Sequence, residues 1–345
     1  MVYDLIVVGG GPAGSTCARR AAQLGLEVLV LEKEKHPRRK ACGGGLTLRI
    51  NDALDLDFTQ VVERELCGQR FYYSSGKSKT YLQPDLGGYT VRREDFDHFL
   101  LQKATEAGAT VQQGARVTDV TEELNQVVVV AGKESYSAKL VVGADGPNST
   151  VARKTGLKTR WDDNEIALCI EAAVPMDPSE ILRIVGDPAG SERITLEFYI
   201  GFLPKGYAWA FAKKNEFSFG IGALVTAVSS LKVYWRKFVT SFEERNGVKC
   251  NLVGQTAARI PVRGIIEKPY SNRIMLIGDA GGFVKSNTGE GIPYAVESGK
   301  IAADVAVDII AEVPKVNTMT YFNRAWNSMG QDLITPHPLF LDESQ

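Results

Sequence analysis

The sequence predicts an α/β protein in which a parallel sheet with its helices is interleaved with a second, antiparallel sheet. An apolar run at residues 2–8 ends in the glycine turn 9–14, residues 15–24 have helical spacing, and a second apolar run follows at 27–32. This order of strand, glycine turn, helix and strand over about 30 residues is typical of a βαβ unit, which favours a parallel sheet. Residues 160–262 contain mostly short strand patterns, which indicate a separate sheet.

The remaining segments add strands and helices to both parts. Weak alternation with several aromatic residues at 50–90 suggests strands of the second layer. Helical spacing of the apolar residues predicts helices at 91–101 with Arg93 at the start, at about 230–245 and at 290–311. Short strand patterns occur at 109–131, 140–146 and 273–282, and the last two run into glycine-containing turns.

At roughly 150 residues per domain, the 345-residue chain predicts two domains. We expect a first, discontinuous domain formed by residues 1–70, 91–158 and 263–330, and a second formed by 71–90 and 159–262. The tail 331–345, which includes Pro336, His337 and Pro338, has no hydrophobic period and receives no assignment.

The composition excludes several classes of protein. With 40 Lys and Arg against 41 Asp and Glu, the net charge is −1, so no global field attracts nucleic acid and we expect no such partner. No stretch of about 18 residues lacks charge, which argues against a membrane-spanning helix. A strand pattern begins at Val2 without the features of a signal peptide, and we therefore expect a cytoplasmic protein.

Cysteine and histidine spacing gives no metal site. The five cysteines are odd in number and scattered, with no CxxC pair, which argues against a disulfide framework and a structural zinc site. The three histidines are also far apart in the sequence. We expect no metal ligands.

The glycine turn has the spacing of a dinucleotide-binding loop. Gly9, Gly11 and Gly14 match G-x-G-x-x-G, a pattern that allows a tight turn, close approach of a pyrophosphate, and close packing of helix on strand. The helix start offers N–H groups to the phosphates. Glu32 ends the second apolar run, where a carboxylate can accept hydrogen bonds from a ribose diol. The alternative is a glycine-rich turn with a surface glutamate.

A second glycine-rich segment, Ala41-Cys42-Gly43-Gly44-Gly45, follows a charged loop at 33–40. Three glycines in a row are entropically costly, so a flexible surface linker is one interpretation. Its position after the second strand of a dinucleotide fold favours the other, in which the backbone lies against the flat ring of the cofactor.

Three blocks that are distant in the sequence resemble the FAD-binding pattern of the para-hydroxybenzoate hydroxylase-like flavoproteins. They are the glycine turn with Glu32, the segment Gly143-Ala144-Asp145-Gly146, and Gly278-Asp279-Ala280 with Gly289-Glu290-Gly291. Within that superfamily the chain is most similar to the geranylgeranyl reductase family, because it contains Lys40-Ala41-Cys42-Gly43-Gly44-Gly45 and Tyr207-Ala208-Trp209-Ala210-Phe211-Ala212-Lys213. The second motif is similar to the family's Y-x-W-x-F-P-K, although Ala212 replaces its proline, and the chain is shorter at its C-terminus than typical members.

The resemblance implies FAD as cofactor, held by a Rossmann-like domain of the GR2 type beside an α+β substrate domain. It implies the following contacts: the turn residues Gly9, Gly11 and Gly14, with Asp145; Ala13 and Glu32 on the adenosine half; Cys42, Gly43 and Gly44 beside the flavin; Arg93 and Val117 on the middle and adenine sides; Asp279 at the ribityl or pyrophosphate region; and Gly291 with Ile292 at the isoalloxazine edge. N–H groups near Gly291 can stabilise negative charge on reduced flavin.

The activity that the resemblance implies is reduction of C=C bonds in a geranylgeranyl or other isoprenoid chain. Hydride from the reduced flavin goes to one alkene carbon and a proton to the other, so an acid or a strongly held geometry is required. We expect Cys42 near that acid, with Tyr207 and Trp209 as walls of the pocket. The alternative for Cys42 is a small buried residue without chemistry, and the two aromatic residues can equally belong to the core.

Two other activities stay open for the same fold: a flavin monooxygenase or hydroxylase that acts on an aromatic or quinone ring, and an electron-transfer flavoprotein without substrate chemistry. A halogenase is less favoured, because the segment 206–212 is only loosely similar to the motif of that class. The electron donor is either NAD(P)H or ferredoxin. An isoprenoid substrate also leaves room for peripheral contact with a membrane.

Overall fold

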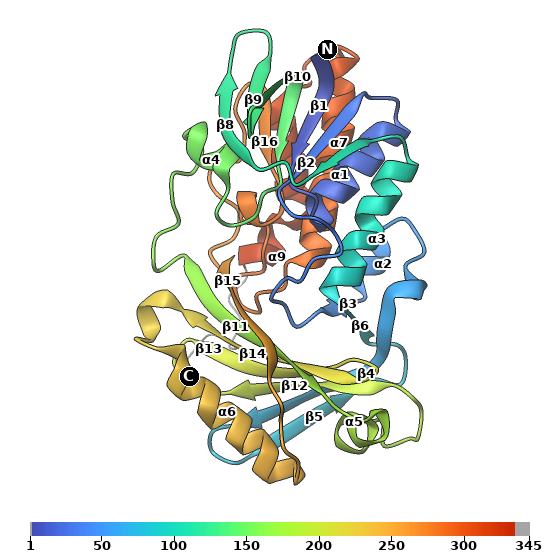
Figure 1. The fold of residues 1–345 in the computed structure, drawn as a ribbon, viewed down its shortest axis with the longest axis vertical. Coiled ribbons are helices and arrows are strands. Elements are labelled where there is room, and N and C mark those ends of the chain that lie inside the picture. Colours follow the sequence, from blue (N-terminus) through green and yellow to red (C-terminus); the bar gives the residue numbers. More distant parts are fainter. Residues whose placement is uncertain (1, 335–345) are drawn as a thin grey trace.

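Two β-sheets, one above the other in Figure 1, organise the computed structural model, which describes residues 2–334. The upper sheet carries parallel strands and packed helices, and the lower sheet is mostly antiparallel. This arrangement confirms the predicted fold class. The tail residues Pro336, His337 and Pro338 lie outside the described residues.

The first sheet has seven strands. In order across the sheet they are β7 (Thr110–Gln113), β2 (Val28–Glu32), β1 (Val2–Val8), β10 (Glu134–Gly143), β9 (Val127–Ala131) and β8 (Val117–Glu122), with β16 (Ile274–Leu276) paired to β10. Neighbours among β7, β2, β1, β10 and β16 run parallel, whereas β8, β9 and β10 form an antiparallel ribbon.

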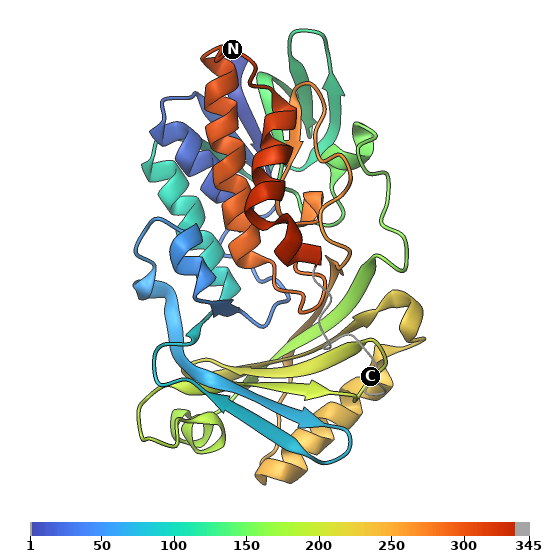
Figure 2. The ribbon, with the colours of Figure 1, turned by 180° about the vertical axis from the view of Figure 1, so that it is seen from behind.

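Successive side chains of β1 point to opposite faces of this sheet, and both faces are covered. Leu5 and Val7 belong to the apolar cluster formed with helices α1 (Pro12–Gln23) and α7 (Ile292–Ile310), and Figure 2 shows α7 lying along that face. Ile6 and Val8 point the other way, into the cluster formed with β8 and β9. Successive side chains of a strand face opposite sides, so the continuous apolar run of β1 is that of a strand buried on both faces.

The second sheet has nine strands. They are, in order, β15 (Val253–Pro261), β11 (Ile166–Pro175), β14 (Glu216–Leu224), β13 (Gly206–Ala212), β12 (Ile194–Ile200), β4 (Val62–Tyr73), β6 (Gly88–Val91) and β3 (Gly45–Thr47), with β5 (Ser78–Leu82) paired to β4. The boundary expected after residue 70 falls inside β4, and the division into domains stays a prediction.

The remaining helices of the described chain are shorter than α7. They are α2 (Arg49–Ala53), α3 (Arg93–Glu106), α4 (Thr150–Lys154), α5 (Pro178–Val185), α6 (Leu231–Asn246), α8 (Thr318–Ala325) and α9 (Gln331–Ile334), with short turns of 3-10 helix at Thr59–Val61, Val225–Ala227 and Gly278–Gly281 and a π-helical turn at Trp326–Gly330. Helices α5 and α6 lie on the face of the second sheet that points away from the first (Figure 1).

The helices predicted from spacing are present, and two more helices, α2 and α5, occur where strands were expected. Helix α5 interrupts the strand-rich segment 160–262. Asp177 caps it by accepting a hydrogen bond from the Ser179 N–H, and Pro178 occupies its first turn. This Asp-Pro start was the signal in the sequence that could have predicted the helix.

Large and small residues alternate across the two faces of the second sheet. On β13 the alanines Ala208, Ala210 and Ala212 pair with the larger Ile221, Phe219 and Phe217 of β14. On the other face the order is reversed, because Tyr207, Trp209 and Phe211 pair with Gly222, Gly220 and Ser218. The register therefore directs one set of aromatic rings toward α6 and another toward the first sheet.

Phe219 joins α6 to the second sheet. It is fully buried, and its ring lies 4.6 Å from that of Phe242 and 5.1 Å from that of Phe238, both on α6. We expect Phe219→Ala to lower the free energy of unfolding by about 3–5 kcal/mol, because the cavity left behind removes these contacts.

Urea titration followed by tryptophan fluorescence measures this change. Val233→Ala, at an exposed position of the same helix, is the matched control and should change the value by less than about 0.5 kcal/mol. Equal effects of the two substitutions would contradict the packing role of Phe219.

Candidate functional site

The glycine turn between β1 and α1 has no room for larger side chains at two of its positions. A Cβ at Gly14 would lie 1.9 Å from the Gly9 carbonyl oxygen, and Gly9 has a φ of 107° against the backbone of Ala144. Gly11 caps α1, and a Cβ there would meet nothing closer than 3.7 Å. Gly9 and Gly14 therefore serve packing, whereas Gly11 leaves open space at the start of a helix.

Glu32 lies directly beside this turn. Its carboxylate accepts hydrogen bonds from the N–H groups of Gly10 at 2.5 Å and Glu34 at 2.8 Å, and the residue is buried. The carboxylate is thus held at the carboxyl ends of β1 and β2, the edge where ligands of open α/β sheets bind.

Arg38 is a nearby residue that the motif analysis missed. One terminal nitrogen lies 3.7 Å from the position of a Cβ on Gly11, and the other, Nη1, is buried without a hydrogen-bond partner among residues 2–334. Its guanidinium also forms an ion pair with Asp97 at 3.0 Å. The run of basic residues after Pro37 was the available signal, because an anion bound at the turn requires a countercharge.

The turn after β16 and the start of α7 meet the glycine turn. A Cβ on Gly278 would contact Ala13 at 3.0 Å, and one on Gly291 would lie 3.6 Å from an Asp279 oxygen. Gly291 caps α7, which begins at Ile292, so the positive end of a 19-residue helix points into this region. The predicted residues Ala13, Asp279, Gly291 and Ile292 are thus brought together.

Lys40 faces Asp279 from the loop that precedes the second glycine run. The ammonium and carboxylate lie 3.9 Å apart. Burial lowers the pKa of Lys40, while Asp279 opposes this shift.

Glycines 43–45 lie tightly between two parts of the second sheet. A Cβ on Gly43 would come within 2.5 Å of the Phe211 ring, and one on Gly44, whose φ is 68°, within 2.1 Å of the Val91 carbonyl oxygen. Lys213 Nζ donates to the Gly43 carbonyl at 2.6 Å. The segment is therefore a fixed strip of backbone and not a flexible linker.

Cys42 opens this strip and lies next to a buried cation. The Arg93 guanidinium donates hydrogen bonds of 2.7 and 2.8 Å to the two oxygens of Asp97 and lies close enough to the Cys42 sulfur to interact with it. Burial alone would lower the pKa of Arg93, but Asp97 and Cys42 raise it above its usual value, so the side chain stays charged. The Gly44 N–H also contacts the Cys42 Sγ at 3.4 Å.

Tyr207 and Trp209 project from β13 toward the first sheet. The Tyr207 hydroxyl donates to the Thr288 carbonyl, which connects the second sheet to the loop before α7. Trp209 is only 6% exposed, and its ring covers Gly220, where a Cβ would lie 1.9 Å from it. The indole nitrogen has no hydrogen-bond partner in the described chain and would lie 2.9 Å from a Cβ on Gly43.

Two predicted residues point away from the centre of this region. The Val117 side chain packs in the apolar cluster behind the first sheet, so only its backbone can face a ligand. The Asp145 carboxylate accepts hydrogen bonds from the Ser149 hydroxyl at 2.5 Å and from the N–H groups of Thr150 and Val151 at 2.6 and 3.2 Å. Its oxygens shape the loop before α4, and contact with the cofactor stays a prediction for both residues.

A cavity of about 200 Å³ lies beside Cys42 and contains polar residues that the sequence analysis did not select. Its lining includes Arg39, Glu171, Lys213 and Ser218. Lys213 ends the motif that begins at Tyr207, but no motif joins all four residues, because they come from a loop, from β11, from β14 and from the position after β13.

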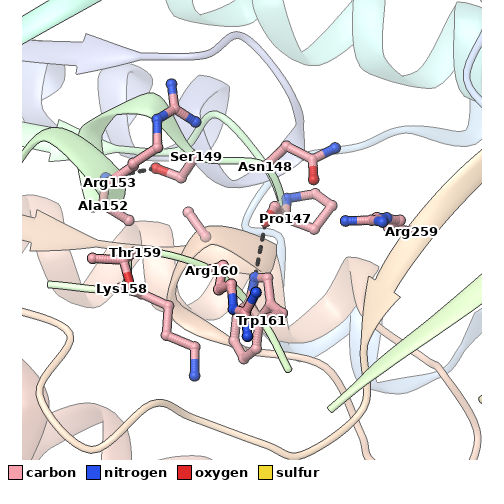
Figure 3. Close-up of a pocket in the computed structure, with 11 residues that line it drawn as sticks. Pro147, Asn148, Ser149, Ala152, Arg153, Lys158, Thr159, Arg160, Trp161 and Arg259 are labelled. Atoms are coloured by element: carbon pink, nitrogen blue, oxygen red, sulfur yellow. Dashed lines mark hydrogen bonds between the residues drawn. The ribbon is translucent and has the colours of Figure 1, made fainter. Parts of the chain in front are cut away.

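A second cavity of about 180 Å³ is lined in part by the loop that follows Asp145 and by α4 (Figure 3). Its charged lining residues are all basic: Arg153, Lys158, Arg160 and Arg259. Trp161 forms part of the wall and donates to the Pro147 carbonyl at 2.8 Å, as Figure 3 shows. Ala280, next to Asp279, connects this wall to the turn after β16.

Comparison with known proteins agrees with this geometry. Residues 4–247 match the family model of the FAD dependent oxidoreductases. Digeranylgeranylglycerophospholipid reductase 1 of Methanococcoides burtonii is 34% identical over 96% of this chain and 81% of its own length. The crystal structure of a geranylgeranyl bacteriochlorophyll reductase-like protein from Thermoplasma acidophilum superposes with a TM-score of 0.84 at 27% identity, covering 96% of this chain and 85% of the other.

Halogenase PltM in complex with FAD has the same fold, with a TM-score of 0.76 at 17% identity over 96% of this chain and 75% of its own. The chain belongs to the FAD-dependent oxidoreductase family and, within it, to the geranylgeranyl reductases.

The residues present fit FAD. The open space at Gly11, the unpartnered nitrogen of Arg38 and the start of α1 form a cradle for a pyrophosphate. Glu32 is positioned for a ribose, and the start of α7 is positioned for the negative charge of a reduced flavin.

Substitutions at Gly14 and Gly11 separate the packing role of the turn from its role in cofactor binding. Gly14→Ala should lower both the melting temperature of the FAD-free protein and the affinity for FAD, because the new Cβ meets the Gly9 carbonyl. Gly11→Ala should leave that melting temperature within about 2 °C and weaken FAD binding at least about tenfold, because its methyl group occupies the space for the phosphates.

Thermal denaturation of the FAD-free protein and titration by flavin fluorescence measure the two effects. Unchanged FAD affinity in Gly11→Ala would contradict the assignment of the turn to the pyrophosphate.

Proposed function

We propose that this protein is an FAD-dependent reductase that saturates C=C bonds in a geranylgeranyl or related isoprenoid chain carried by a lipid, quinone or chlorophyll-type molecule. The observation that carries the proposal is the aromatic face of β13 against the glycine strip beside Cys42. Tyr207, Trp209 and Phe211 present a wall of rings toward the region where the FAD residues converge. Such a wall suits an apolar chain and excludes water.

When bound, FAD supplies the hydride for this reaction. The protein supplies position: the glycine turn, Arg38 and Glu32 hold the dinucleotide half, and Asp279 with the α7 start holds the part that leads to the flavin ring. Cys42, Gly43 and Gly44 limit the space beside that ring. The distances above support these assignments.

An isolated alkene has no polar group, so the protein must deliver a proton to one carbon as the other receives hydride. Cys42 is the candidate donor, because its sulfur lies at the end of the glycine strip and is contacted by the Arg93 guanidinium. An arginine cannot release its proton at neutral pH, so it orients the sulfur and does not compete with it.

The electron donor is NAD(P)H or ferredoxin, and the basic cavity in Figure 3 favours the nucleotide. Its cationic side chains and volume of about 180 Å³ suit a phosphate group. No helix within residues 2–334 has the length and apolar character needed to cross a membrane. We propose a cytoplasmic protein in peripheral contact with the membrane that holds its lipid substrate.

The test of the proposed function is anaerobic. The FAD-loaded protein is reduced with dithionite and mixed with geranylgeranyl compounds, and the product is analysed by mass spectrometry. Oxidation of the flavin with a gain of two hydrogens per double bond is the expected result. Oxidation by oxygen alone, without a hydrogenated product, would favour the hydroxylase alternative, and transfer to a protein acceptor alone would favour the electron carrier.

Cys42→Ser tests the proton donor. We expect the rate of prenyl reduction to fall about 100-fold, since a hydroxyl is a much weaker acid than a thiol, while FAD affinity stays unchanged. Cys250→Ser, a half-buried thiol of the second sheet region, is the control and should keep the full rate. A Cys42→Ser protein with the full rate would show that the thiol is a packing residue.

Replacing both Arg160 and Arg259 with alanine tests the basic cavity. If NAD(P)H binds there, its KM should rise about tenfold or more, because a contact between a charged donor and a phosphate is removed. The rate with dithionite as reductant should not change. Arg236→Ala, on the exposed face of α6, is the control and should leave this KM unchanged. An unchanged KM in the double variant would place the nucleotide elsewhere.

A further inference from the structure

The cavity beside Cys42 contains two ionisable side chains that are almost completely buried and to which the assignments above give no function. Lys213 is 2% exposed and Glu171 5% exposed. Lys213 lies at the end of β13, two residues beyond Phe211, and its Nζ donates to the Gly43 carbonyl at 2.6 Å. Burying a lysine is costly unless a specific partner or function compensates.

Glu171 reaches the same strip of backbone through a serine. The Ser218 hydroxyl lies 3.2 Å from the Glu171 Oε1 and 3.3 Å from the Cys42 carbonyl oxygen. Arg39, at the outer end of the cavity, contacts the Glu171 Oε2 at 3.4 Å and also the Val253 carbonyl on the exposed edge strand β15. Polar groups therefore continue from the protein surface to the Cys42 carbonyl oxygen, and the Cys42 and Lys213 side chains line the same cavity.

We propose that Glu171 and Lys213 form the route by which protons from solvent reach Cys42, with Lys213 as the group that restores the proton to the sulfur. The inference rests on the proposed function, in which Cys42 gives a proton to the alkene carbon. In the balanced step, the S–H bond of Cys42 breaks as a C–H bond forms, Lys213 then transfers a proton to the thiolate, and the neutral amine regains a proton from solvent through Glu171. The electrons come from the reduced flavin, so no further reductant is required.

The surroundings of Lys213 suit a group that gains and loses a proton. Burial lowers the pKa of Lys213 to about 8, and Cys42 is the largest of the influences that oppose this shift. Burial also raises the pKa of Glu171, while Arg39 and the Ser218 hydroxyl oppose the rise. The charged and titratable groups that face Lys213 or line its cavity are Arg39, Lys40 and Cys42 from the loop, Glu63 from β4, Arg92, Arg93 and Glu94 at the start of α3, Glu171 from β11, and Glu216 from β14.

Lys213→Arg and Lys213→Met separate a proton-transfer role from a structural one. Arginine keeps the positive charge and can donate to the Gly43 carbonyl, but it does not release its proton. If Lys213 only holds the strip in place, arginine should restore activity. If it transfers protons, both variants should lower kcat about 100-fold with little change in substrate KM. Lys214→Met, at the exposed neighbouring position, should have the wild-type rate.

The pH dependence gives a second readout. A proton donor must be protonated, so the wild-type rate should fall as the pH rises through about 8, and Glu171→Gln should lower kcat at all pH values while keeping FAD affinity. A wild-type kcat and pH profile in Lys213→Arg would overturn the proposal. So would a Glu171→Gln protein with the wild-type rate.

A third readout needs neither FAD nor substrate. In FAD-free protein with Cys250→Ser, the rate of Cys42 alkylation by iodoacetamide is followed against pH by peptide mass spectrometry. We expect Lys213 to add an inflection near pH 8 to this profile, so the profile of Lys214→Met should match that of the parent protein, and those of Lys213→Met and Lys213→Arg should lack this added inflection. The same profile in all four proteins would overturn the coupling of lysine and thiol. An inflection without any prenyl reduction would leave the coupling intact and reject the proposed function.

Discussion

The close approach of a bare backbone strip, Gly43–Gly45, to the aromatic face of β13 is the constraint on which the rest of the site depends. The strip has Phe211 and Trp209 on one side and the Val91 carbonyl on the other, and neither side can move without breaking a sheet. Val91 is held in turn, because its N–H donates to the Gly44 carbonyl at 2.8 Å. Rigid elements around a site give more accurate placement than loops do. The three glycines thus contribute a fixed surface, despite the conformational entropy that they lose on folding.

The same strip connects the two sheets in function. Cys42, which precedes the strip, faces the Arg93–Asp97 pair at the start of α3, and Gly43, its first residue, accepts the Lys213 hydrogen bond from the second sheet. Two short hydrogen bonds compensate for the free-energy cost of burying the Arg93–Asp97 pair. Because the pair is buried, salt in the solvent screens its attraction only weakly. Arg93, which stays charged, and Lys213, which can lose its charge, therefore both lie near the Cys42 thiol.

Much of the fold and the FAD cradle could be predicted from the sequence, because both rest on local patterns. The glycine spacing, the apolar runs of β1 and β2, and the helical period of α7 each report a conformation within a short segment. Cys42, Tyr207 and Trp209 were found through motifs. Lys213 ends the second motif but was not selected as a site residue, and Glu171 and Ser218 belong to no motif, because these side chains meet only through the register of β11, β13 and β14. Arg38 was missed because its partner Asp97 lies on another element, and α5 because a short cap signal was outweighed by the strands around it.

Strand β13 divides its side chains strictly between two environments, with rings on the side of the strip and methyl groups on the side of α6. A strand has a side-chain period of two, so loss of a single residue between Gly206 and Trp209 would exchange the faces for everything that follows. Indole and phenyl rings would then meet Phe219 and Phe242, where there is no space, and methyl groups would face the glycines. Evolution of this enzyme class can therefore change the size of the rings in this strand far more easily than its length.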